Sequence, residues 1–168
     1  MSSVMVTKSI LIVDDDQGIL KSFKDILEPE GYKVDTVATG VEAVEKCKAH
    51  PYNLAIIDIK LRDVEGTDLL ARVHEILPRA RKIMITGYPS LENAVDSVNL
   101  QADAYIIKPV NPEMFLRVVA ENMDKQLEAE KMTQEKVVGW VESRYEETRR
   151  NRSKRKLLAP EQLPNAEE

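Results

Sequence analysis

The sequence has a single cysteine, Cys47, few aromatic residues and no long apolar run. One cysteine excludes an internal disulfide, and its place in a helix-like stretch favours a buried, unreactive thiol. No apolar run approaches the ~20 residues that span a bilayer, and the first residues lack the apolar stretch of a secretory signal. We therefore expect a soluble, cytoplasmic protein without a membrane span.

An excess of positive charge is also lacking, because the formal net charge of the 168 residues is −5. This charge argues against a protein that coats nucleic acid with its whole surface, although it leaves room for a local basic patch. The length suits one domain of ordinary size with a modest extension, and it excludes a second large catalytic domain.

Five apolar runs alternate with amphipathic segments, a rhythm that predicts a doubly wound parallel α/β sheet with crossover helices. The expected strands are residues 9–13, 33–37, 54–58, 82–86 and 104–107. The helical patterns between them rest on Ile19, Phe23, Ile26 and Leu27, on Ala43, Val44 and Cys47, on Leu69, Leu70, Val73 and Leu77, and on Leu91, Ala94, Val95 and Val98.

Residues typical of helix ends agree with this division of the chain. Gly31 follows the first helical pattern, Thr39 precedes the second and Ser90 precedes the fourth. Glycine favours helix ends, and a serine or threonine side chain caps a helix start. These residues therefore predict where three of the helices stop or begin.

Polar residues stand at the ends of four of the expected strands. The run at 14–16 is Asp-Asp-Asp, Asp58 ends the third strand, Thr86 the fourth, and Lys108 with Pro109 follows the fifth. The carboxyl ends of parallel strands line one crevice, so these residues are expected to converge. Acids, a hydroxyl and an ammonium in one crevice suit a phosphoryl group with a divalent cation.

Each residue type has a role in such chemistry. The carboxylate of Asp58 can attack phosphorus without a base to remove a proton first, and Asp14 and Asp15 offer the hard oxygen ligands that Mg²⁺ prefers. Thr86 and Lys108 can each bind a phosphoryl oxygen. His50 and His74 belong to helical segments away from the crevice, so we expect them at the surface.

Each motif alone is more often structural, since an aspartate run after a strand is commonly a turn and helix cap. Together, however, the runs ILIVDDD at 10–16, AIIDIKL at 55–61, IMITGYP at 83–89 and ADAYIIKPV at 102–110 resemble the receiver domain of two-component response regulators. The resemblance covers about residues 7–127. It implies a flavodoxin-like sheet of five parallel strands in the order 2-1-3-4-5.

The resemblance also implies residue roles. Asp58 corresponds to the phosphorylated aspartate, Asp14 and Asp15 to the acidic pair that holds Mg²⁺ or Mn²⁺, and Lys60 to the residue whose backbone carbonyl binds the metal. The remaining matches are the switch hydroxyl of Thr86, the lysine Lys108, the switch aromatic Tyr105 and Pro109, whose preceding peptide is often cis.

Such a protein is a signalling phosphoacceptor rather than an enzyme. Its implied partners are a sensor histidine kinase or phosphotransfer protein and a downstream protein that meets the face formed by the fourth helix, fifth strand and fifth helix. A phosphohydrolase that turns over at Asp58 is the less favoured reading, because Ile59 and Lys60 follow Asp58 where that class has an Asp-x-Asp pair.

From Pro112 the pattern predicts one long helix, since Gly139 is the one helix breaker before Pro160. About 45 helical residues would extend ~65 Å. Glu130 and Gln134 interrupt the apolar seam of a coiled coil, which makes a coiled coil doubtful; a homodimer remains an alternative. A separate apolar cluster, either a docking face or a surface that folds back on the domain, comprises Val137, Val138, Trp140, Val141 and Tyr145.

Six cations crowd into the last helical turns: Arg149, Arg150, Arg152, Lys154, Arg155 and Lys156. We call residues 149–156 the basic tract. We divide the chain into a receiver at 1–127, a helical extension at 128–157 and a disordered tail at 158–168. The extension is too short for a separate output domain, which favours signalling through protein contacts. The alternative is a binder of nucleic acid or an anionic surface through the basic tract.

Overall fold

The computed structural model describes residues 6–157, and the tail expected at 158–168 lies outside them. Five parallel strands pair in the order β2-β1-β3-β4-β5, which confirms the fold class and strand order expected from the sequence. The strands are β1 (Ser9–Val13), β2 (Lys33–Val37), β3 (Leu54–Asp58), β4 (Arg81–Thr86) and β5 (Ala104–Ile107). Of these, β4 begins one residue earlier than expected.

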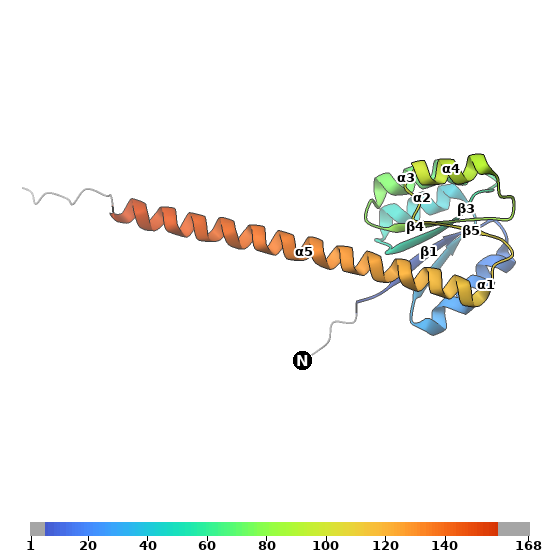
Figure 1. The fold of residues 1–168 in the computed structure, drawn as a ribbon, viewed down its shortest axis with the longest axis horizontal. Coiled ribbons are helices and arrows are strands. Elements are labelled where there is room, and N and C mark those ends of the chain that lie inside the picture. Colours follow the sequence, from blue (N-terminus) through green and yellow to red (C-terminus); the bar gives the residue numbers. More distant parts are fainter. Residues whose placement is uncertain (1–5, 158–168) are drawn as a thin grey trace, which may run out of the picture. The chain divides into compact units, whose positions relative to one another are not determined.

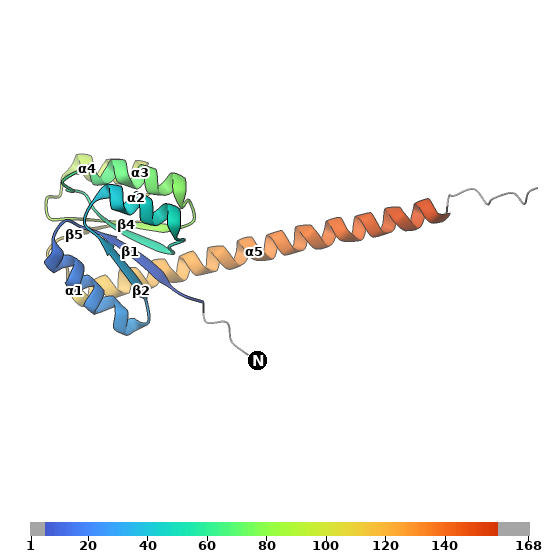
Figure 2. The ribbon, with the colours of Figure 1, turned by 180° about the vertical axis from the view of Figure 1, so that it is seen from behind.

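Helices cover both faces of the sheet (Figure 1). Helix α1 (Gln17–Leu27) and the first part of α5 (Pro112–Leu157) pack on one face, and α2 (Gly40–Ala49), α3 (Gly66–Ile76) and α4 (Leu91–Asn99) lie on the other (Figure 2). Successive strand residues point to opposite faces. In β1, Ile10 and Ile12 therefore join the α1 and α5 side, and Leu11 and Val13 join the α2 and α3 side.

The helix ends follow local chemistry. Thr39 Oγ1 accepts a hydrogen bond from Glu42 N at 3.2 Å, and Ser90 Oγ accepts one from Asn93 N at 3.1 Å. A short 3-10 helix, η1 (Glu28–Glu30), extends α1 and stops at Gly31, whose φ of 89° is left-handed. Glycine adopts this conformation without the strain of a side chain, so all three predicted helix boundaries are confirmed.

In helix α4, most residues of the apolar pattern are exposed to solvent. Leu91, Val95 and Val98 are exposed, and Ser97 is the one buried residue among the nine residues of α4. The hydroxyl of Ser97 donates to Asn93 O at 2.7 Å, so its burial leaves no unpaired polar group. The apolar pattern predicted the helix correctly, but most of that pattern faces outward.

Helix α5 belongs to two compact units, residues Met1–Glu128 and Ala129–Glu168. All of its buried residues, from Phe115 to Gln126, lie in the first unit. Two hydrogen bonds of 2.8 Å hold this part of α5, from Arg81 Nε in β4 to Asn122 Oδ1 and from Asn53 Nδ2, just before β3, to Gln126 Oε1. Every residue from 134 to 157 is exposed. Over residues 6–157, no helix has a stretch long and apolar enough to cross a membrane.

Candidate functional site

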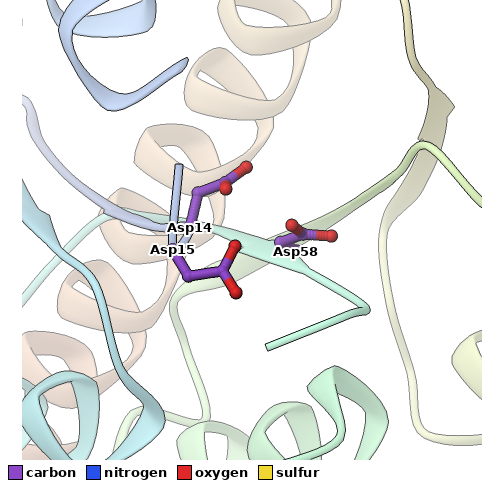
Figure 3. Close-up of side chains that lie close together, drawn as sticks. All are labelled: Asp14, Asp15 and Asp58. Atoms are coloured by element: carbon purple, nitrogen blue, oxygen red, sulfur yellow. The ribbon is translucent and has the colours of Figure 1, made fainter. Parts of the chain in front are cut away.

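Three carboxylates meet at the carboxyl edge of the sheet (Figure 3). Asp14 and Asp15 follow β1, Asp58 ends the neighbouring β3, and oxygens of the three side chains lie within 4.8 Å of one another. Asp14 is 2% exposed and Asp58 is 6% exposed. Gathering buried carboxylates is unfavourable unless cations neutralise them, so this arrangement needs positive charge.

Lys108, which follows β5, supplies a cation from within the protein. Its Nζ donates to Asp14 Oδ2 at 2.8 Å and to Asp58 Oδ2 at 3.3 Å. Burial alone would lower the pKa of Lys108, but its contacts with Asp14 and Asp58 outweigh burial and leave the pKa above its ordinary value. The ammonium therefore stays charged in the pocket.

Asp58 experiences opposing influences. Burial and the negative charge of Asp14 raise its pKa, while the backbone amide of Lys60 and the ammonium of Lys108 lower it, and the net shift is upward. The Lys60 amide donates to Asp58 Oδ1 at 3.1 Å. The backbone of Lys60 thus lies beside the carboxylate, while its Nζ lies 3.9 Å from Glu65 Oε1 at the surface.

The turn after Asp58 is closed by Gly66, whose amide donates to Ile59 O at 2.8 Å. A Cβ at position 66 would lie 2.2 Å from the Asp58 carbonyl oxygen. Such a contact is far inside van der Waals distance. The close approach of α3 to the end of β3 therefore requires glycine here.

Thr86 ends β4 and is fully buried, with its Oγ1 accepting a hydrogen bond from Tyr88 N at 3.0 Å. Tyr105 on β5 is half buried against the α2 and α3 side of the core. Its hydroxyl is buried and has no hydrogen-bond partner in the described part of the chain. The peptide bond between Lys108 and Pro109 is cis.

Asp16 does not join the acidic cluster. Its carboxylate caps α1 by accepting from Gly18 N at 2.9 Å and from Ile19 N at 3.2 Å. Its own backbone amide donates to Asp14 Oδ1 at 2.9 Å, which orients that carboxylate. The aspartate run therefore divides, since Asp14 and Asp15 belong to the acidic cluster and Asp16 caps the helix.

Sequence reasoning missed Arg62, whose Nε lies 3.5 Å from Asp15 Oδ2 at the rim of the site. It lies on an irregular loop, and no local sequence signal predicts that contact. His50 is exposed as expected, whereas His74 is only partly exposed. His74 is half buried because its Nδ1 lies 3.1 Å from Nζ of the buried Lys82, which needs polar partners.

The donor set fits a hard divalent cation such as Mg²⁺ or Mn²⁺, because carboxylate oxygens are the ligands these ions prefer. Lys108 and Arg62 bind oxygens of the same three acids and partly neutralise them. The basic tract lies in the second unit, and all six of its cations are exposed.

Comparison with known proteins gives a consistent result. Residues 10–120 match the family model of the response regulator receiver domain. The alginate biosynthesis transcriptional regulatory protein AlgB of Pseudomonas aeruginosa is 34% identical over 124 residues, which cover 74% of this chain and 27% of AlgB. The acid tolerance regulatory protein ActR of Rhizobium meliloti is 31% identical over 121 residues, 72% of this chain and 62% of ActR. The chain thus spans about a quarter of AlgB and less than two thirds of ActR.

Solved structures extend this likeness. A CheY-like response regulator receiver domain protein from Methanospirillum hungatei has a TM-score of 0.72 and 52% identity, covering 74% of this chain and 99% of that one. A response regulator from Burkholderia pseudomallei has a TM-score of 0.65 and 31% identity, covering 74% of this chain and 72% of that one. The latter was crystallised with a phosphorylated aspartic acid, a calcium ion and citrate.

Proposed function

Since this chain belongs to the family of response regulator receiver domains, we propose that it is the phosphoacceptor of a cytoplasmic two-component system, with Asp58 as the phosphorylated residue. The phosphoryl donor is a sensor histidine kinase or a phosphotransfer protein. The chain itself is a signalling protein rather than an enzyme that acts on other substrates.

The single observation that supports this proposal is the meeting of Asp14, Asp15 and Asp58 with the ammonium of Lys108 at one edge of the sheet. An oxygen of the Asp58 carboxylate attacks phosphorus, the P–O bond forms, and the P–N bond to the donor histidine breaks. The departing imidazole takes a proton from solvent. No base is required on the receiver, because a carboxylate attacks through an oxygen that carries no proton.

Charge must be balanced as the phosphoryl group arrives. Asp14, Asp15, the Asp58 carboxylate and the backbone carbonyl of Lys60 would hold Mg²⁺, which neutralises the acids and the incoming phosphoryl oxygens when bound. Lys108 already contacts Asp58, so its ammonium is close enough to bind a phosphoryl oxygen once one is attached there. A fixed cation beside developing negative charge is a strong source of stabilisation.

Thr86 and Tyr105 are the proposed switch. The Thr86 hydroxyl, which now accepts from Tyr88 N, would turn to donate to the phosphoryl group, and Tyr105 would follow the rearranged loop. The exposed apolar residues Leu91, Val95, Val98 and Ile107 offer a surface near this switch for a downstream protein. Phosphorylation would then shift the population of conformations that this partner binds.

The test is incubation with acetyl phosphate and Mg²⁺, followed by intact mass measurement of the wild type, Asp58→Asn and Asp16→Asn. Asp16→Asn is the matched control, because it removes a neighbouring carboxylate outside the cluster and keeps a good helix cap. We expect a phosphoryl adduct in the wild type and the control. Asp58→Asn, or removal of the metal by a chelator, should abolish it. Absence of an adduct in the wild type would overturn the proposal.

A further inference from the structure

The basic tract lies outside the region that matches the receiver family model, which ends at residue 120. Six of its eight residues are cations, all are exposed, and none of the six forms a salt bridge with any residue between 6 and 157. The helical extension therefore carries six positive charges near its end that no salt bridge within residues 6–157 neutralises. We propose that the basic tract binds the phosphate backbone of a nucleic-acid duplex.

The cations surround the helix rather than lining one side. With 3.6 residues per turn, successive residues are about 100° apart, and the six basic positions leave no gap wider than roughly 100°. The other two residues of the tract, Asn151 and Ser153, are also polar. No face of this segment can pack against an apolar surface without burying an unpaired charge.

The distribution of the cations around the helix distinguishes between classes of binding partner. A helix that lies in a membrane interface needs an apolar face opposite its charged one, and the basic tract has none. Pairing of two basic tracts in a coiled coil would bring like charges together. A polyanion suits the basic tract best, because it binds the cations and does not require an apolar face on the helix.

The spacing of charge favours a duplex in particular. Eight helical residues span about 12 Å, so the six cations provide roughly one charge every 2 Å. A DNA duplex carries one negative charge per about 1.7 Å of axis, a closely similar density. Four of the six cations are arginine, whose planar group binds phosphate oxygens in pairs.

The rest of the chain is acidic and confines this binding to the tract. The formal net charge of −5 includes the six tract cations, so the remaining residues together carry −11. Such a body repels a polyanion over most of its surface. Binding should therefore be local and steeply dependent on salt.

Fluorescence anisotropy of the full-length protein with a labelled DNA duplex of arbitrary sequence tests the proposal. If six phosphates are neutralised, log K should fall with log salt at a slope of about −5. The tract variant R149Q/R150Q/R152Q should halve this slope and weaken binding at low salt. The same measurement with a duplex RNA distinguishes which duplex is preferred, and binding to either supports the proposal.

The matched control is K125Q/K131Q/K136Q, which removes three exposed cations from the same helix outside the basic tract. It should bind the duplex as the wild type does, and circular dichroism should show equal helix content in both variants. Asp58→Asn should also bind normally, so the result is independent of the proposed phosphorylation. Absence of duplex binding at low salt, equal loss in the control, or binding only to phosphatidylserine vesicles would overturn the proposal.

Discussion

Lys108 places its ammonium on the same carboxylates that a divalent cation would use. Its contacts with Asp14 Oδ2 and Asp58 Oδ2, at 2.8 and 3.3 Å, neutralise part of the charge in the pocket. A metal that enters must therefore share these oxygens with a fixed positive charge. Lys108 would have opposite effects on the two proposed ligands, because its charge disfavours the cation and favours the phosphoryl group.

The substitution Lys108→Met separates these effects. We expect Mg²⁺ to bind about tenfold more tightly, because about 1.4 kcal/mol of charge repulsion is removed. We also expect phosphoryl uptake to slow by about a hundredfold, as when one charge-stabilising donor is lost. Calorimetric Mg²⁺ titration measures the change in Mg²⁺ affinity, and timed labelling with acetyl phosphate measures the rate of phosphoryl uptake. Lys24→Met, on the surface of α1, is the control, and weaker Mg²⁺ binding by Lys108→Met would contradict the argument.

Cys47 is buried in α2, and its thiol should be inert in the folded protein. Burial raises its pKa to about 11, against a small opposing influence from Lys82, so almost no thiolate is present at neutral pH. We expect a thiol reagent such as DTNB to react with the native protein at pH 8 at least about a hundredfold more slowly than with the guanidine-unfolded chain. Comparable rates in the two states would show that the thiol is accessible.

At the residue scale, the sequence predicts which residues lie at the ends of strands. Asp14, Asp58 and Lys108 each follow a short apolar run, and parallel strands bring such ends together. The contact of Arg62 with Asp15 and the burial of Lys82 beside His74 have no such local signal. Both contacts depend on how loops and helix ends pack against the folded sheet.

The loop between β3 and α3 is held to the start of α2 by Asp63. Its carboxylate accepts from Gly40 N at 2.9 Å and from Val41 N at 3.1 Å, so it caps a helix that begins 23 residues earlier in the chain. The amide of Gly40 is the largest influence that lowers the pKa of Asp63. This link braces the loop that contains Lys60, next to the candidate phosphorylation site.

Asp63→Asn should lower the stability of the native state at neutral pH, because an asparagine can accept at only one of the two positions. A carboxyl with a lowered native pKa contributes stability above its unfolded pKa of 3.8, and loses it as the pH falls through the native value. The difference between wild type and variant should therefore shrink below about pH 4. Urea unfolding at pH 7 and pH 3 measures this, with exposed Glu45→Gln as the control. A pH-independent difference would refute the capping role.

Element boundaries were predictable where their cause is local. Thr39, Ser90 and Gly31 stop or start helices through contacts within a few residues. The orientation of α4 was not predictable, because its period reveals a helix but not which side meets the sheet. The small, self-satisfied Ser97 faces inward, and Leu91, Val95 and Val98 remain exposed.

At the scale of the whole molecule, the buried part of α5 ends at Gln126, inside the first compact unit. A chain that ends at Glu128 should therefore unfold cooperatively with a stability within about 1 kcal/mol of the full chain, and accept phosphoryl groups equally well. A chain that ends at Ala120 loses buried Met123 and the anchors Asn122 and Gln126. It should lose at least about 3 kcal/mol. Urea titration of both truncations tests this, and equal destabilisation would contradict it.

The pocket joins residues that are far apart in the chain. Lys108 is 94 residues from Asp14 and 50 from Asp58. The ribosome makes the two acids first, and Lys108 emerges only after all five strands, so it reaches the acids only when β5 has paired with β4. A nascent chain therefore lacks the complete candidate site until the sheet has formed. New copies of the protein would therefore accept a phosphoryl group from the proposed kinase only after they have folded.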